Sequence, residues 1–324
     1  MSTLRLEAPP DVAIDYFRLF VNRRAYTLQS TRPHRVSGCH YYYRPKDKAG
    51  QGLSLTPETI RRHLAGEITI ALYAINPANQ SSKWVAIDAD YPDALADLAR
   101  IRSQLRHDGV DSALENSRRG GHLWIFAAEP LPARQLRIYV CDLAVRLGIP
   151  IKPGRQREGI EIFPKQDALK PGRYGNAIRG PLGIHRRAGQ RFWFLGAEEN
   201  IEAQMHYLNS VPKVTSDQLA RLIAGKSMPP QLVRPKRTWC PGEPEFRILD
   251  HIHTPLHAVG HNNMTRCPSC AEDGHDHSGD NLSISIEDPR KYICWAGCTR
   301  DMIRMAVGCP RPDVGAAQKA NHGL

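Results

Sequence analysis

Two aspartates end an apolar run in the middle of the chain. In the segment KWVAIDAD, Asp88 and Asp90 follow the residues WVAI directly. Residues i and i+2 of a β-strand point to the same face, so both carboxylates would project together, with their Cα atoms roughly 7 Å apart. Hard divalent cations prefer such oxygen ligands. Asp-x-Asp is also common at solvent-facing strand ends, but the apolar run favours a metal site, because unpaired charge is costly beside a buried strand.

A histidine follows a basic, glycine-rich turn. The segment SRRGGHLWIF places His122 after Arg118, Arg119 and two glycines. Glycines let the backbone approach a ligand closely, and guanidinium groups suit phosphate oxygens. His122 would then donate a hydrogen bond to a phosphate, and both arginines are candidate nucleotide or template contacts. The alternative is a structural histidine at the start of a strand.

A third acid lies further along the chain, in GIEIFPKQ. Glu161 would complete a set of three metal-binding carboxylates, and two cations about 4 Å apart can activate a hydroxyl and stabilise a leaving pyrophosphate. Lys165 and Gln166 follow just past this predicted strand, where a nucleotide would reach them. The next segment, LKPGRYGNAIRGPLGIH, reads either as a loop that binds a triphosphate or template strand, or as an ordinary basic surface loop. Its candidate contacts are Arg173, Asn176 and Arg179.

Four cysteines near the C-terminus have the spacing of a zinc site. They form a C-x2-C pair, Cys267 and Cys270, and a C-x3-C pair, Cys294 and Cys298. Four thiolates suit one tetrahedral zinc ion with no open position, which is a structural site. The alternative ligand set replaces one cysteine with His275 or His277. The remaining cysteines lie outside the pattern: Cys39, Cys141, Cys240 and Cys309.

Strand and helix patterns mix along residues 1–200. Helical spacing of apolar residues covers residues 11–28, 55–66, 92–109 and 133–148, and residues 201–225 also read as helical. Strand patterns cover residues 67–75, 83–90, 112–117, 122–129, 159–165 and 190–196. The elements do not alternate as in a doubly wound sheet. We therefore predict an α+β catalytic domain around a mixed or antiparallel sheet.

The composition changes after this domain. Residues 1–225 form the predicted catalytic domain, and residues 226–246 are rich in proline and basic residues, as in an extended linker. Residues 247–309 hold the cysteines and form a small zinc ribbon domain, with two strands between the cysteine pairs and a short helix after them. Residues 310–324 are expected to be a disordered tail.

The charge of the chain narrows the class of partner. The formal net charge is +11 and the pI about 9.4, which favours polyanions, nucleic acid above all. No apolar run approaches the roughly 18 residues that a spanning helix needs, and no secretory leader is visible. We therefore expect a soluble, cytoplasmic protein without a membrane partner. Eight cysteines are too few for a disulfide scaffold.

In their order along the chain, these segments resemble the archaeo-eukaryotic primase superfamily, also called primase-polymerases. The family's hhhDhD/E, small-x-His and third acidic motifs correspond to VAIDAD, GGHLWIF and IEIFPKQ. The segments HLAGEITIALYAI and FPKQDALKPGRYGNAIRGPL resemble the branch of bacterial conflict systems and CRISPR-associated primase-polymerases. The likeness covers roughly residues 12–200. It departs at Gly120, where relatives often have serine.

The resemblance implies a site and an activity. Asp88, Asp90 and Glu161 would hold two Mg²⁺ or Mn²⁺ ions, and His122 would contact the phosphates of the incoming nucleotide. Arg118, Lys165 and Arg179 would contact phosphates or the template. The implied reaction is template-directed nucleotidyl transfer from NTPs or dNTPs on single-stranded DNA, as a DNA primase or polymerase. The alternatives are a non-catalytic nucleic-acid-binding module and a metal-dependent nuclease.

The cysteine module resembles a second family domain. A Cys-Pro-x-Cys pair, the strand LSIS and a Cys-x-x-x-Cys pair before a helix are similar to the zinc-binding domain of bacterial-type primases. The likeness implies that this domain holds template DNA or the initiating nucleotide near the catalytic domain. A helicase or Cas protein is a further possible partner.

Overall fold

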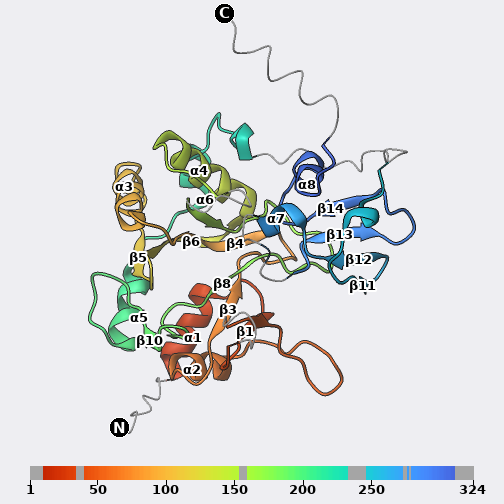
Figure 1. Cartoon of the computed structure of the whole chain (residues 1–324). Coiled ribbons are helices and arrows are strands. Elements are labelled where there is room, and N and C mark those ends of the chain that lie inside the picture. The colour runs from red at the N-terminus through yellow and green to blue at the C-terminus, as the bar shows by residue number, and fades with distance from the viewer. Residues whose placement is uncertain are drawn as a thin grey trace, which may run out of the picture. The chain divides into compact units, whose positions relative to one another are not determined.

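The computed structural model describes residues 10–33, 40–152, 159–232, 246–272, 276 and 279–310. The chain divides into two compact units, Met1–Val233 and Arg234–Leu324 (Figure 1). Within the described ranges, no helix has both the length and the apolar content needed to cross a bilayer. Cys39, Cys240, His275 and His277 lie outside the described residues, as do residues 311–324 of the predicted tail.

The first unit combines helices with short strands. Its helices are α1 (Pro10–Phe20), α2 (Pro57–Leu64), α3 (Ala94–His107), α4 (Ala133–Arg146), α5 (Ile201–Ser210), α6 (Ser216–Leu222) and the 3-10 helix η1 (Pro230–Leu232). Its strands are β1 (Tyr26–Gln29), β2 (Tyr42–Tyr43), β3 (Ile70–Tyr73), β4 (Ser81–Ala89), β5 (Ala113–Asn116), β6 (Gly121–Pro132), β7 (Glu161–Phe163), β8 (Ala177–Arg179), β9 (Ile184–His185) and β10 (Gln190–Arg191).

Two four-stranded sheets carry this unit. The first sheet has the order β2-β1-β3-β8 and the second has the order β5-β6-β4-β7, while β9 and β10 form a separate pair. The neighbouring strands of both sheets run antiparallel. The α+β prediction with an antiparallel sheet is therefore confirmed.

Strand β4 lies inside the second sheet and is buried on both faces. Trp84 and Ala86 belong to one hydrophobic core, and Val85 and Ile87 belong to another, as the alternation of strand side chains requires. Helices α3 and α4 cover the second of these faces, while α1, β1 and β3 lie on the other side (Figure 1). A strand with two buried faces needs a continuous apolar run, which explains the residues WVAI before the aspartates.

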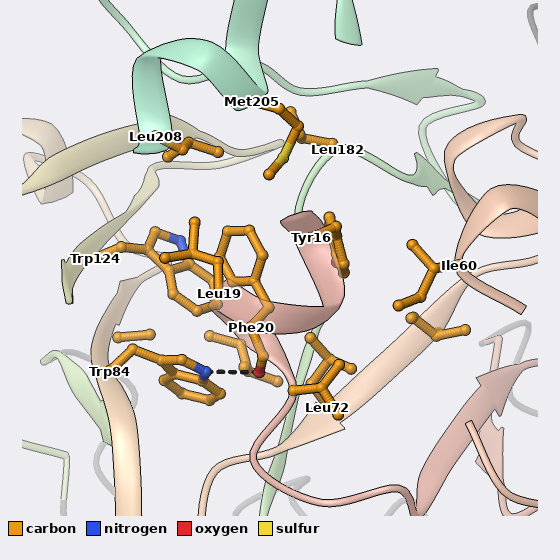
Figure 2. Packing of buried hydrophobic residues seen from close by; sticks show 14 of the residues in the cluster. Tyr16, Leu19, Phe20, Ile60, Leu72, Trp84, Trp124, Leu182, Met205 and Leu208 are labelled. Atoms are coloured by element: carbon orange, nitrogen blue, oxygen red, sulfur yellow. Dashed lines mark hydrogen bonds between the residues drawn. The ribbon is translucent and has the colours of Figure 1, made fainter. Parts of the chain in front are cut away.

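The first core is built around aromatic side chains. The rings of Trp84 and Trp124 lie 5.0 Å apart, and Phe20 meets Trp124 edge-on at 5.3 Å. Figure 2 shows Trp84 Nε1 donating a hydrogen bond to the carbonyl oxygen of Phe20, at 2.8 Å. The end of α1 is thereby tied to β4, next to the segment that carries the aspartates.

The structure corrects two boundaries. The helical pattern of residues 11–28 ends at Phe20, and β1 begins at Tyr26. Asn22 explains the break, because its side chain donates to Ala74 O at 3.0 Å and accepts from Lys83 N at 2.7 Å. Residues 177–179 of the predicted basic loop form β8, which pairs with β3.

The second unit contains η2 (Ile248–His251), β11 (His257–Val259), β12 (Asn262–Thr265), α7 (Pro268–Glu272), β13 (Leu282–Ser285), β14 (Tyr292–Cys294) and α8 (Arg300–Ala306). Its strands form one antiparallel sheet in chain order. The two strands and the helix predicted around the second cysteine pair correspond to β13, β14 and α8. Of the predicted linker, Met228 and Leu232 pack against the second core of the first unit, and residues 233–245 lie outside the described ranges.

We predict that Trp84→Ala lowers the free energy of unfolding by about 3–5 kcal/mol, because it leaves a cavity in the aromatic core. Trp84→Phe keeps an aromatic ring but loses the hydrogen bond to Phe20, so we expect a smaller loss of about 1–3 kcal/mol. Urea denaturation followed by circular dichroism measures both. The control is Leu53→Ala, at a side chain that is 44% exposed, which should stay within about 0.5 kcal/mol of the wild type. Equal stability of Trp84→Ala and wild type would contradict this account of the core.

Candidate active site

Four polar side chains form a row across the second sheet. Asp88 on β4 pairs with His122 on β6 and with Glu161 on β7, and His122 pairs with Glu115 on β5. Directly paired residues of an antiparallel sheet share a face. This face is the one that carries Trp84 and Ala86 further along β4, so the polar row lies where the first core ends.

Two members of this row, Asp88 and His122, line a cavity of about 330 Å³, whereas Glu115 and Glu161 are not among its lining residues. Asp88, Asp90 and His122 line it from the second sheet and the end of β4, and Gln29, Tyr42 and Arg179 line it from the first sheet. The cavity therefore lies between the two sheets. Its other lining residues are His40, Ser117, Arg118, Arg119, Phe163, Ala177, Ile178, His185 and Arg187.

Asp88 is a half-buried acid of this cavity, with its side chain 24% exposed. Its Oδ1 is buried and has no hydrogen-bond partner among the described residues, and its closest cationic group is His122 Nε2 at 3.5 Å. Burial raises the pKa of Asp88, and the neighbouring Asp90 and Glu161 raise it further, against the opposing charge of His122. An under-compensated carboxylate of this kind fits a bound cation, which would supply the missing positive charge.

The two other acids are held by basic side chains. Asp90 pairs with Arg119 at 2.5 Å, and Glu161 pairs with Lys165 and, at 3.5 Å, with Lys152. Burial alone would raise the pKa of Asp90, but the Arg119 guanidinium outweighs it and holds that pKa below its usual value.

The three carboxylates do not gather around one point. Among the described residues, only the four cysteines of the second unit bring three or more potential ligand atoms of Asp, Glu, His or Cys within 4.8 Å of one another. Asp88, Asp90 and Glu161 are thus neighbours on one edge of the site, but they do not converge on a shared point in this arrangement. Shared cations would have to displace Arg119 and Lys165.

The glycine-rich turn is pressed against the end of β4. A Cβ atom on Gly120 would lie 2.1 Å from the carbonyl oxygen of Ala89, a distance that no side chain tolerates. The serine that relatives often carry here does not fit this backbone. The close approach brings Ser117 and Arg119 of the same turn onto Asp90.

Glu115 orients His122 and was not identified from the sequence. Its side chain is fully buried, and its Oε2 lies 2.7 Å from His122 Nδ1 and accepts from Trp124 Nε1 at 3.2 Å. Its Oε1 accepts from the Arg179 guanidinium at 3.0 Å. Burial alone would lower the pKa of His122, but Glu115 and Asp88 outweigh it and raise that pKa. The Nδ1 edge of the imidazole is thereby occupied, and its Nε2 edge is left on the side of Asp88.

The remaining predicted contacts divide into two groups. Arg118, Arg119 and Arg179 line the cavity, and Arg179 is a buried partner of Glu115 rather than a loop residue. Four others are not among the cavity residues: Lys165, Gln166, Arg173 and Asn176. The side chains of Gln166 and Asn176 hydrogen-bond each other, so they hold their loop together. The lining residues Gln29, His40, Tyr42 and Arg187 were not predicted.

The four cysteines of the second unit come together as the spacing predicts. All four are buried, and their sulfur atoms lie within 4.8 Å of one another. The separations from Cys298 are 3.3 Å to Cys267 and 3.4 Å to Cys270. Tetrahedral thiolates about 2.3 Å from one ion would be roughly 3.8 Å apart, so the cluster has the size of a four-thiolate metal site.

We predict that Glu115→Gln lowers the free energy of unfolding by about 3–5 kcal/mol, because it leaves the Arg179 guanidinium buried without its counter-charge. Chemical denaturation is the measurement. The matched control is Glu58→Gln, which breaks the exposed pair with Arg61 and should cost less than about 1 kcal/mol. Comparable losses for the two variants would show that the buried network is not a structural constraint.

Two solved structures are similar to parts of this chain. The crystal structure of the catalytic domain of primase Repb′ in complex with initiator DNA is 9% identical, with a TM-score of 0.33, and covers 62% of this chain and 93% of that one. The polymerase domain of Mycobacterium tuberculosis Ligase D in complex with DNA is 13% identical, with a TM-score of 0.29, and covers 67% and 87%.

No curated protein matches the chain significantly. The model of the TOTE conflict system archaeo-eukaryotic primase domain matches residues 28–222, which is more than half of the chain. The resemblance drawn from the sequence motifs is therefore confirmed. This protein belongs to the archaeo-eukaryotic primase domain family of TOTE conflict systems.

Proposed function

We propose that this protein is a primase-polymerase that joins nucleotides on a single-stranded DNA template, using NTPs or dNTPs. Membership of the archaeo-eukaryotic primase family supports nucleotidyl transfer on DNA as the general activity. The observation that carries the proposal for this chain is the row of Asp88, His122 and Glu161 beside an arginine-lined cavity. Because the proposed template is DNA, we also propose that the protein acts in the cytoplasm.

The three carboxylates are the proposed ligands of two divalent cations, Mg²⁺ or Mn²⁺. Such ions supply positive charge for the attacking 3′-hydroxyl and the leaving pyrophosphate. The buried Oδ1 of Asp88, which has no hydrogen-bond partner among the described residues and lies 3.5 Å from His122 Nε2, supports this assignment most directly. Asp90 and Glu161 would exchange their basic partners, Arg119 and Lys165, for the cations.

The chain's basic groups bind and orient the nucleotide in this proposal. His122, fixed through Nδ1 by Glu115, would donate from Nε2 to a phosphate oxygen. Arg119 and Lys165, once released from their carboxylates, would be free to contact phosphates close to the metal ligands. Through this exchange a nucleotide with its cations would replace two ion pairs at once, and each of the four side chains would keep an opposite charge beside it. Arg118 would add a phosphate or template contact from the same turn.

A nuclease and a non-catalytic binding module are the alternatives. Paired carboxylates serve hydrolysis as well as transfer, so the geometry alone favours neither reaction. Incorporation of nucleotide, rather than loss of template, separates the proposed function from a nuclease. Neither reaction would be observed for a binding module.

We predict that Asp88→Ala with Asp90→Ala reduces incorporation of labelled dNTPs or NTPs on a circular single-stranded template by at least about 10³-fold, because the cation ligands are lost. The matched control, Asp111→Ala with Asp217→Ala, removes two exposed aspartates and should retain activity. Supplying dNTPs and NTPs separately also identifies the preferred sugar. Equal product from the double variant and the wild type would refute the proposal, and degradation without added nucleotide would favour the nuclease.

We further propose that the cysteine cluster binds one structural zinc ion. The four buried sulfurs support a closed site without an open position, and the second unit is too small to rely on its core alone. Its proposed task is to present template DNA or the initiating nucleotide. A helicase or Cas partner stays a prediction from the resemblance.

We predict that purified protein carries about one equivalent of zinc and that Cys294→Ser loses most of it, because three thiolates hold the ion less tightly. Elemental analysis by mass spectrometry measures the content. Cys141→Ala is the control, because Cys141 is a buried cysteine of α4 outside the cluster, and its zinc content should match the wild type. Full zinc content in Cys294→Ser would remove this residue from the ligand set and favour a histidine ligand.

A further inference from the structure

Two arginines share one tyrosine ring in the first unit. The guanidinium carbon of Arg44 lies 4.0 Å from the ring centroid of Tyr174, and that of Arg23 lies 4.6 Å from the same centroid. Arg23 also lies 5.6 Å from the ring of Tyr73, which packs on Tyr174 at 5.4 Å between centroids. Stacking on the aromatic faces restricts the orientation of both guanidinium groups. Without it, such long side chains on a surface would adopt many orientations.

No carboxylate of the described residues pairs with these two arginines. Within the described ranges, neither Arg23 nor Arg44 forms an ion pair, and the side-chain hydrogen bond of Arg23 goes to the carbonyl oxygen of Arg173 at 3.4 Å. Burial lowers the pKa of Arg23; Tyr174 and Tyr73 oppose this shift, and the charge of Arg44 adds to it. Two guanidinium groups held together against their repulsion form a site for an anion with several acceptor oxygens, as a phosphate has.

Three exposed tyrosines directly precede Arg44 in the chain. Tyr41, Tyr42 and Tyr43 are 52%, 42% and 45% exposed, and the rings of Tyr41 and Tyr43 lie 6.0 Å apart. Alternation along β2 separates Tyr42 from the other two, and Tyr42 lines the cavity that contains Asp88. Arg44 follows within two residues, at most about 7 Å along the chain from Tyr42. Arg44 is therefore close in the chain to a residue that lines the candidate active site, although neither arginine lines it.

We propose that Arg23 and Arg44, held on Tyr174, clamp a backbone phosphate of a single nucleic-acid strand, with Tyr41 and Tyr43 stacking its bases. This inference rests on the proposed function and names the path by which the template enters. Phosphates plus alternating aromatic rings are the recognition chemistry of single strands. A nucleotide triphosphate is the other source of phosphate, but neither arginine lines the cavity, which has arginines of its own.

The test measures binding alone, so that it does not depend on catalysis. A fluorescein-labelled 20-mer of oligo-dT is titrated with protein in EDTA, without nucleotide, and followed by anisotropy at several salt concentrations. For Arg23→Gln with Arg44→Gln we expect about tenfold weaker binding and a salt dependence, log Kobs against log [salt], that is shallower by about 0.7–1.4. The matched control is Arg61→Gln with Arg100→Gln, which removes two exposed arginines that already pair with acids, and it should bind like the wild type.

Further variants separate the clamp from simple charge. Arg44→Lys keeps the charge but not the planar stacking, so it should bind between the wild type and the double variant. Tyr41→Ala with Tyr43→Ala should weaken binding, whereas the matching double change to Phe should restore it, because stacking needs the ring and not the hydroxyl. Thermal melting checks that each variant is folded.

Each outcome decides the inference. Wild-type affinity and salt slope in Arg23→Gln with Arg44→Gln would overturn it, as would losses equal to those of the Arg61 and Arg100 control. If dATP or ATP displaces the oligonucleotide from the wild type and from the Arg61 and Arg100 control, at concentrations that do not displace it from Arg23→Gln with Arg44→Gln, the arginines are assigned to a triphosphate and the inference is overturned too. Because the assay contains no metal, a failure of nucleotide incorporation leaves this result unchanged, and a failure here leaves the proposed function standing.

Discussion

One buried carboxylate organises the centre of the first unit. Glu115 has no exposed surface, and an isolated charge there would be prohibitively costly. It is compensated from two directions, by His122 on the neighbouring strand and by Arg179 on β8 of the other sheet. Burial alone would raise the pKa of Glu115, but Arg179 and His122 outweigh it and hold that pKa below its usual value. The same contacts that satisfy this charge join the two sheets and orient the histidine.

The second constraint is the double burial of β4. Its odd and even positions serve two different cores, so the strand has no freedom to rotate or slip by one residue without exchanging the two sets of side chains. Asp88 lies on the same face of β4 as Trp84 and Ala86, at the end of the strand that reaches the cavity. The aspartate's position is therefore determined by the packing of tryptophans several residues away, and the aromatic core and the polar row are two ends of one face.

The local patterns predicted part of this arrangement. Alternation in KWVAIDAD and the glycine-rich turn before His122 identified the segments that meet, because strand periodicity and turn chemistry are properties of short stretches. The cysteine pairs were equally local. The family match confirms the resemblance that these segments carried.

What escaped prediction depends on contacts distant in sequence. Glu115 is a lone acid in an apolar strand, and its partner becomes visible only when the turn at 117–120 sets the hairpin register. Residues 177–179 read as loop because their strand character comes from pairing with β3 rather than from their own composition. Asn22 ends a helical pattern through hydrogen bonds to residues more than fifty positions away. The ion pair between Asp90 and Arg119, which lie 29 residues apart, likewise depends on the folded chain and is not visible in any motif.

The late position of β8 has a consequence for how the protein is made. Arg179 reaches Glu115 from a strand that pairs with β3, about a hundred residues earlier in the chain. While the ribosome has released only the segments up to β7, Glu115 is deprived of one of its two counter-charges and the first sheet lacks an edge strand. The nascent chain therefore holds an incomplete first unit until residue 179 emerges, and in this interval a holdase chaperone would protect its exposed edges.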